Sequence, residues 1–205
     1  MSKNSDVKNM LKDALVLFVI TLIAGLSLGF VYELTKEPIR IQNEKAVQRA
    51  CQAVFAGAES FDVLKYDPPT DLTKELKETG VTIGTIFEAK DGSGNAVGYV
   101  VETTSAEGYG GNIILYAGIT KDGILNGISI LSIAETPGLG MNAESVLVPQ
   151  FENIPATLFT YTKSGSTSES EIDAISGATI TTKAIVGAVN GAVKVVTEDI
   201  CKGGD

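Results

Sequence analysis

An uncharged run near the N-terminus constrains this chain more than any other feature. Residues 14–32 read ALVLFVITLIAGLSLGFVY and contain no charged side chain. A helix of about twenty apolar residues crosses the hydrocarbon core of a bilayer, where a helix satisfies its own backbone polar groups. The run therefore predicts one transmembrane helix over 14–32, preceded by a short N-terminal tail at 1–13.

Two other interpretations of this run are a buried core helix and a cleaved signal peptide. Core helices rarely stay uncharged over such a length, and a signal peptide has a shorter apolar region followed by an A-x-A-like site. Here the run ends in GFVYELTKEP, which is a poor cleavage site. We therefore expect an uncleaved membrane anchor.

The basic residues beside the run do not orient it in the membrane. Because the positive-inside rule compares Lys and Arg on the two sides, similar numbers on both sides leave it undecided. The residues on the two sides are Lys3, Lys8 and Lys12 before the run, and Lys36, Arg40 and Lys45 after it.

Composition excludes several classes of function. The chain has 205 residues, a net charge of −9 and no histidine. It lacks a basic cluster, so we expect no nucleic-acid partner. Without histidine it lacks the commonest general base, metal ligand and haem ligand. Cys51 and Cys201 are too few for an iron–sulfur cluster or a four-cysteine zinc site, although a disulfide between them stays open. Any redox chemistry then requires an organic cofactor.

The remaining sequence predicts an α+β domain. Apolar residues at helical spacing indicate a connecting amphipathic helix over 33–57, beginning near Pro38. A domain over 58–205 follows, with a short helix at 71–78.

Four runs rich in Val, Ile, Thr and Tyr are separated by turn residues, which predicts an antiparallel meander packed with helices. These strands are expected at 81–91, 95–105, 112–122 and 123–133. A glycine-rich loop at 135–140, a helix at 143–151, a segment at 160–171 and a final helix at 179–200 complete the domain.

The final helix begins in a turn rich in hydroxyls, DAISGATITT at 173–182. A helix N-terminus carries unpaired N–H groups and the positive end of a dipole, so it binds phosphate readily. Gly177 and Ala178 leave space for a bulky group. Donors or a nucleophilic oxygen are offered by Ser176, Thr179, Thr181 and Thr182. Ordinary helix capping explains the same composition, so the residues alone leave both interpretations open.

Three motifs resemble the FMN-binding domain family. The stretch DAISGAT at 173–179 resembles its flavinylation motif, Asp-x-x-(Ser/Thr)-Gly-Ala-Thr. The stretch at 106–119 resembles its Gly-Tyr-Gly-Gly turn, and 128–140 resembles its Glu-Thr-Pro-Gly-Leu-Gly loop. With the N-terminal span, the pattern covers the chain and is most similar to G subunits of Rnf electron-transport complexes. The C subunits of Na⁺-translocating NADH:quinone reductases are similar but longer. One departure is Asn112, where many relatives have Pro.

The resemblance implies a covalent cofactor, FMN joined to Thr179 through a phosphoester. A separate Mg-dependent flavin transferase would recognise Asp173. The other implied cofactor-binding residues are Ser176, Gly177, Ala178, Thr182, Lys183, Tyr109, Glu135, Thr136, Gly138 and Leu139. For Glu135, Tyr109 and Lys183, the residues by themselves allow a solvated or packing role equally well.

The resemblance further implies a flavoprotein that relays electrons between other subunits of an ion-translocating ferredoxin:NAD oxidoreductase. It implies that the large domain lies on the outer face of the cytoplasmic membrane, with no catalytic residue of its own. The alternatives are a standalone extracytoplasmic FMN-binding redox module, the quinone reductase C subunit, and a non-redox anchored binding protein whose hydroxyls only cap a helix.

Overall fold

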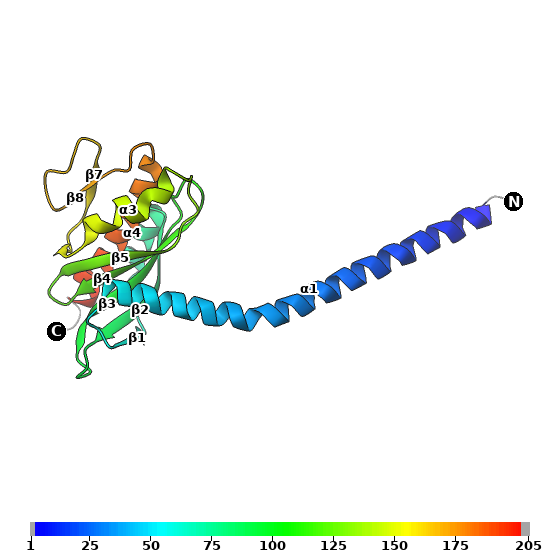
Figure 1. Ribbon diagram of the computed structural model, residues 1–205, viewed down its shortest axis with the longest axis horizontal. Coiled ribbons are helices and arrows are strands. Elements are labelled where there is room, and N and C mark those ends of the chain that lie inside the picture. Colours follow the sequence, from blue (N-terminus) through cyan, green and yellow to red (C-terminus); the bar gives the residue numbers. More distant parts are fainter. Residues whose placement is uncertain (1–2, 202–205) are drawn as a thin grey trace. The chain divides into compact units, whose positions relative to one another are not determined.

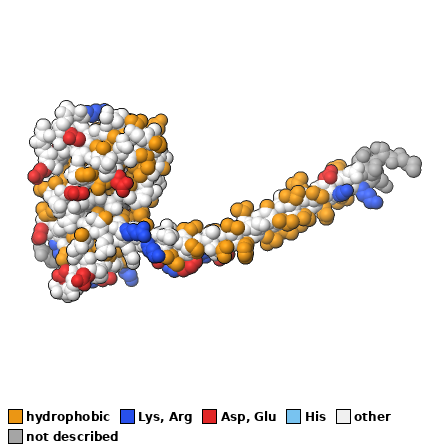
Figure 2. All heavy atoms as spheres, in the orientation of Figure 1, with side chains coloured by type: hydrophobic (Ala, Val, Ile, Leu, Met, Phe, Trp, Pro, Cys, Tyr) orange, Lys and Arg blue, Asp and Glu red, His pale blue; other side chains and the backbone are white. Residues whose placement is uncertain are grey.

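The N-terminal part of the chain is one long helix. In the computed structural model, which describes residues 3–201, α1 runs from Lys3 to Val54. Its most apolar window has a mean hydropathy of 2.6, and none of that window is buried among residues 3–201. Figure 2 shows hydrophobic side chains along much of the helix. By length and composition, α1 can cross a membrane, as the uncharged run predicts.

The predicted start of a separate helix near Pro38 is wrong, because Pro38 lies inside α1. Proline lacks an N–H and usually interrupts a helix. Here ion pairs one turn apart support the helix around it, since Arg40 lies 2.5 Å from both Glu37 and Glu44. The predicted tail is likewise helical from Lys3, and residues 1–2 lie outside the described part.

The domain is built on a six-stranded antiparallel sheet whose strands follow one another in sequence order (Figure 1). The meander predicted for its four central strands is confirmed. The two edge strands were not predicted from the sequence, because they are short. The strands are β1 (Ser60–Leu64), β2 (Val81–Lys90), β3 (Ala96–Ser105), β4 (Ile113–Thr120), β5 (Ile124–Ser132) and β6 (Ile154–Pro155).

Each face of the sheet carries its own hydrophobic core. One core lies beneath α2 (Thr70–Glu78) and α4 (Thr179–Lys194), and includes Leu115 of β4. The other lies beneath the last turns of α1 and includes the neighbouring residue, Tyr116. Successive side chains of a strand point to opposite faces, so β4 contributes to both cores. The compact unit that contains the sheet accordingly starts at Ala46, within α1.

The helix predicted at 143–151 is wrong as a single element. It is split into α3 (Ala143–Val146) and the 3₁₀ turn η2 (Val148–Phe151), preceded by the 3₁₀ turn η1 (Gly140–Asn142). Pro149, at the start of η2, has no N–H to continue the α-helical hydrogen bonds.

A small second sheet precedes α4. It pairs β7 (Thr160–Thr162) in parallel with β8 (Glu171–Asp173). After β8 the chain turns into α4, which begins at Thr179 as predicted and continues as a π-helical turn, η3 (Val195–Ile200). This connection places the hydroxyl-rich turn at the edge of the domain core.

Candidate cofactor site

The N-terminus of α4 is not capped by a side chain. Its N-cap residue is Ala178, and the first backbone bond of the helix runs from Thr182 N–H to the Ala178 carbonyl at 3.0 Å. The N–H groups of residues 179–181 therefore have no acceptor within the described chain. The structure does not support the capping interpretation of this turn, and it leaves the positive end of the helix dipole available to an anion.

The Thr182 hydroxyl is used inside the turn instead. It donates to the Ala178 carbonyl at 3.0 Å and accepts from the Ile175 N–H at 3.1 Å. Thr182 is fully buried, so it holds the shape of the turn that presents Thr179. The structure does not bring Thr182 to a ligand-accessible position.

A cavity of about 580 Å³ opens beside this helix start. That volume lies within the range of small-molecule sites. The three stretches that carry the family resemblance meet there, although they are far apart in sequence. The lining residues are Tyr109, Glu135, Thr136, Leu139, Gly140, Gly177, Ala178, Thr179, Ile180 and Thr181.

Glycines allow these stretches to approach one another. A Cβ on Gly110 would lie 1.9 Å from the Ala134 carbonyl oxygen, which no side chain can tolerate. A Cβ on Gly140 would lie 2.6 Å from the Thr181 hydroxyl and 2.7 Å from Cβ of Glu135. The loop at 135–140 thus packs directly against both the turn at 108–111 and the start of α4.

The cavity has a polar side and an apolar rim. Thr179 and Thr181 contribute hydroxyls without a hydrogen-bond partner in the described chain, beside the free N–H groups of α4. Tyr109, Leu139 and Ile180 keep 71%, 40% and 51% of their surface exposed. Free donors beside exposed apolar groups suit a ligand with a phosphate and a flat ring.

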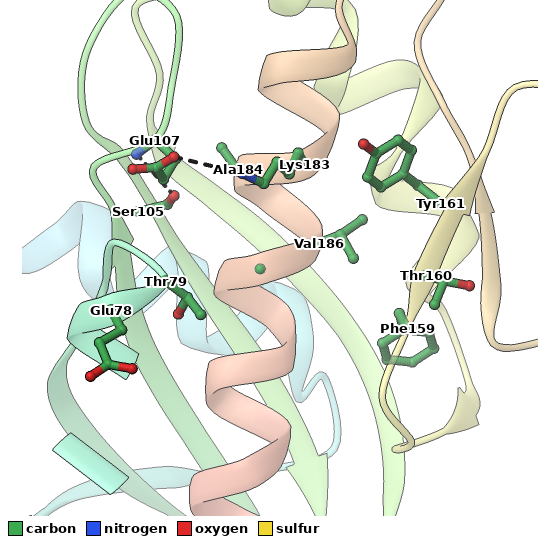
Figure 3. A pocket seen from close by; sticks show the side chains of 11 residues that line it. Glu78, Thr79, Ser105, Glu107, Phe159, Thr160, Tyr161, Lys183, Ala184 and Val186 are labelled. Atoms are coloured by element: carbon green, nitrogen blue, oxygen red, sulfur yellow. Dashed lines mark hydrogen bonds and ion pairs between the residues drawn. The ribbon is translucent and has the colours of Figure 1, made fainter. Parts of the chain in front are cut away.

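Lys183 points away from this cavity in the structure. Its Nζ lies 3.8 Å from a carboxylate oxygen of Glu107, and it lines a second cavity of about 370 Å³ beside the following turns of α4. Figure 3 shows this pair on one side of α4, with Tyr161 of β7 on the other side. The structure therefore gives Lys183 a surface ion pair and does not bring it to the polar side of the first cavity.

Asp173 also lies outside the cavity lining, at the end of β8. The Gln150 side chain accepts from its N–H at 2.7 Å and donates to its carbonyl at 3.1 Å. Its own carboxylate accepts from the Ser166 N–H at 2.6 Å. Ser176 and Gly138 are exposed and likewise do not line the cavity.

Gly140 and Ile180 line the cavity but were not among the predicted site residues, and Thr181, which the sequence offered only as one of the hydroxyls of the turn, also lines it. Gly140 lies inside the motif at 128–140 and Thr181 inside the hydroxyl-rich turn at 173–182, so the small size of one and the hydroxyl of the other were visible in the sequence. Ile180 gave no signal, because one exposed apolar residue in the first turn of a helix is ordinary.

The two cysteines are free, with Cys51 buried and Cys201 exposed. Burial raises the pKa of the Cys51 thiol to about 11, so it is unreactive near neutral pH. No cluster of His, Cys, Asp and Glu suited to a metal ion occurs in residues 3–201.

The family models define the class of this chain, an FMN-binding domain that follows a long N-terminal helix. The family model described as FMN-binding domain matches residues 108–194, and the one described as RnfG N-terminal region matches residues 1–54. The chain is 34% identical over 196 residues to the G subunit of the Na(+)-translocating ferredoxin:NAD(+) oxidoreductase complex of Acetobacterium woodii, with 93% of each chain covered. The chain belongs to the family of Rnf complex G subunits.

Two further relatives have similar lengths. The G subunit of the ion-translocating oxidoreductase complex of Methanosarcina acetivorans is 32% identical, covering 94% of this chain and 97% of the relative. The G subunit of the proton-translocating ferredoxin:NAD(+) oxidoreductase complex of Clostridium ljungdahlii is 32% identical, and the match covers 96% of this chain and 97% of that relative. Among solved structures, Shewanella oneidensis NqrC aligns with a TM-score of 0.49 and 19% identity, covering 73% of this chain and 72% of NqrC.

Proposed function

We propose that this protein carries FMN covalently on Thr179 and relays electrons within a membrane-bound, ion-translocating ferredoxin:NAD oxidoreductase. The observation that carries the proposal is the uncapped start of α4, which opens on the cavity at Thr179. The names of the relatives support the electron-transfer setting.

The residues of the cavity have distinct tasks in this proposal. The N–H groups at the start of α4 hold the phosphate, and the Thr179 oxygen forms the ester bond. Gly177 and Ala178 leave space for the phosphate to reach the backbone. Tyr109 and Leu139 contact the flat ring. The bound FMN supplies reversible electron acceptance, which no side chain of this protein provides.

Attachment requires a separate flavin transferase that uses FAD. In that transfer the Thr179 oxygen would bond to the FMN phosphorus as the FAD pyrophosphate bond breaks, AMP would leave with the bridging phosphate oxygen, and the hydroxyl proton of Thr179 would be released to solvent. Asp173 and Ser176 serve recognition by that enzyme, which agrees with their positions outside the cavity lining. Thr179 is therefore an attachment point and not a catalyst.

The test is the intact mass of protein purified from its native membrane. We expect an added mass equal to FMN less one water, on the tryptic peptide that contains Thr179. Thr179→Ala should remove the flavin completely, and Thr179→Ser should retain it because the hydroxyl is kept. Flavin found on Thr181 in the unmodified protein, or no flavin at all, would contradict the assignment.

The same proposal anchors α1 in the membrane with the domain on the outer face. The support is the apolar, unburied stretch of α1 together with the ion-translocating complexes to which the relatives belong. An anchor keeps a small electron carrier close to its partners, and covalent attachment prevents loss of FMN where none is supplied.

Orientation is testable with the native thiols. Cys201 is exposed and Cys51 is buried, so a membrane-impermeant maleimide should label only Cys201 in intact spheroplasts. Cys201→Ser is the matched control and should abolish the label. Labelling that appears only after the membrane is permeabilised would place the domain inside.

A further inference from the structure

A single ionisable carboxylate lines the candidate FMN cavity, and it has almost no contact with solvent. Glu135 is the one acidic or basic side chain among the lining residues, and only 7% of its surface is exposed. No lysine or arginine pairs with it in the described part of the chain. Its Oε1 accepts one hydrogen bond, from the Gly110 N–H at 3.3 Å.

Folding alone gives no reason for a carboxylate at this position. Burying a carboxylate with one weak hydrogen bond and no cation costs free energy. A glutamine has nearly the same shape, and its carbonyl oxygen accepts the same bond at a lower desolvation cost, because an amide is uncharged. A negative charge held at this cost beside the cavity acts on any ligand bound there.

We propose that Glu135 lowers the reduction potential of FMN held in this cavity, which rests on the function proposed above. Reduction brings negative charge into the cavity, and a carboxylate opposes it through Coulomb repulsion. That repulsion is stronger in a partly dry cavity than in water. The start of α4 acts in the opposite sense, because its N–H groups favour negative charge.

The positive end of α4 and the Glu135 carboxylate also lie on different parts of the cavity wall. The free N–H groups belong to the helix that carries Thr179, so they lie beside the phosphate. Glu135 belongs to the loop after β5, whose Gly140 packs against Thr181. In this arrangement the helix retains the cofactor, and Glu135 sets how strongly the cofactor takes up electrons.

The experiment measures midpoint potentials by spectroelectrochemistry on full-length protein matured with its flavin transferase. Glu135→Gln removes the charge and keeps an acceptor for Gly110. We expect it to favour one-electron reduction at least tenfold, which corresponds to a rise of about 59 mV. Glu135→Ala removes both charge and acceptor and should raise the potential in the same direction.

Glu107→Gln is the matched control. Glu107 is also acidic and close in sequence to Gly110, but it is exposed and pairs with Lys183 outside the cavity. Its substitution should leave the potential unchanged.

An unchanged potential in Glu135→Gln with FMN still on Thr179 would overturn this proposal and leave the proposed function intact. Failure of that variant to acquire FMN would also overturn it, because Glu135 would then serve attachment. Unmodified protein without flavin on Thr179 would instead overturn the proposed function itself.

Discussion

The two faces of the sheet contain similar apolar residues, and the candidate cofactor cavity borders the helix that covers one of them, α4. On the α1 face, Cys51, Val54 and Phe55 pack against β3 and β4 and close the core. On the α4 face, the core is closed beneath the helix, but the helix start borders a cavity. The difference arises where each helix meets the domain: the last turns of α1 pack fully on the sheet, while α4 begins in a turn that faces the 135–140 loop.

Glycines allow close contacts on both faces of the sheet, but with different results. Gly118 lets Val54 of α1 rest on the sheet, since a Cβ there would lie 2.8 Å from the Val54 side chain and carbonyl oxygen. Gly140 lets a loop support a cavity wall without filling the cavity. We therefore expect alanine at these two positions to damage different properties of the protein.

The largest effect is expected from Gly140→Ala. The new methyl group would press on Thr181 and Glu135 and shift the loop into the cavity, so covalent flavin per chain should fall at least tenfold. The amount of covalent flavin per chain is measured as in-gel flavin fluorescence relative to stained protein. Gly127→Ala is the control, because its Cβ would make only an ordinary contact at 3.9 Å with Glu152. Full flavin loading in Gly140→Ala would mean that the loop does not shape the site.

A smaller effect, on stability alone, is expected from Gly118→Ala. Overpacking of a dense core costs about 1–3 kcal/mol, and here it would push α1 from β4. Urea unfolding of the full chain in detergent, followed by near-ultraviolet circular dichroism of its tyrosines, measures the loss. Flavin loading of the folded protein should not change. If loading falls as far as in Gly140→Ala, the two faces do not act independently.

The smallest effect concerns Cys51 at alkaline pH. Its pKa is raised from 9.0 to about 11, chiefly by burial. The unfolded chain therefore loses this proton first as the pH rises. The protonated Cys51 thiol therefore makes its full contribution to folding stability below pH 9, and this contribution is lost as the pH increases toward 11. At pH 10 the loss is about 1.4 kcal/mol, equivalent to one pKa unit.

Urea midpoints at pH 8 and pH 10 test this expectation. Cys51→Ala should lower the urea midpoint at both pH values. Its midpoint should, however, fall less between pH 8 and pH 10 than that of the unmodified protein. Cys201→Ala, at an exposed position, should keep most of the decrease. An equal decrease in Cys51→Ala would assign the alkaline sensitivity to other groups, such as the buried Tyr116, whose pKa is also raised by burial.

Much of the candidate site was predictable because its motifs are local. The start of α4 at Thr179 and the turns that contain Tyr109 and Leu139 follow from short stretches of sequence. The lining role of Ile180 was not predictable, and the sequence offered the hydroxyls of Thr181 and Thr182 alike. Which of the two lines the cavity depends on the direction of the helix, because neighbouring positions point about 100° apart. That geometry places Thr181 in the cavity lining, while the Thr182 hydroxyl bonds within the turn.

The sequence by itself determined the apolar helix, the four central strands and the hydroxyl-rich start of the last helix. These depend on charge, side-chain shape and spacing over a few residues. Only the tertiary structure decided that Glu135 meets Gly110, that Lys183 turns to Glu107, and that the end of α1 closes one face of the sheet. Each of those contacts joins residues far apart in the chain, so it depends on how the elements pack.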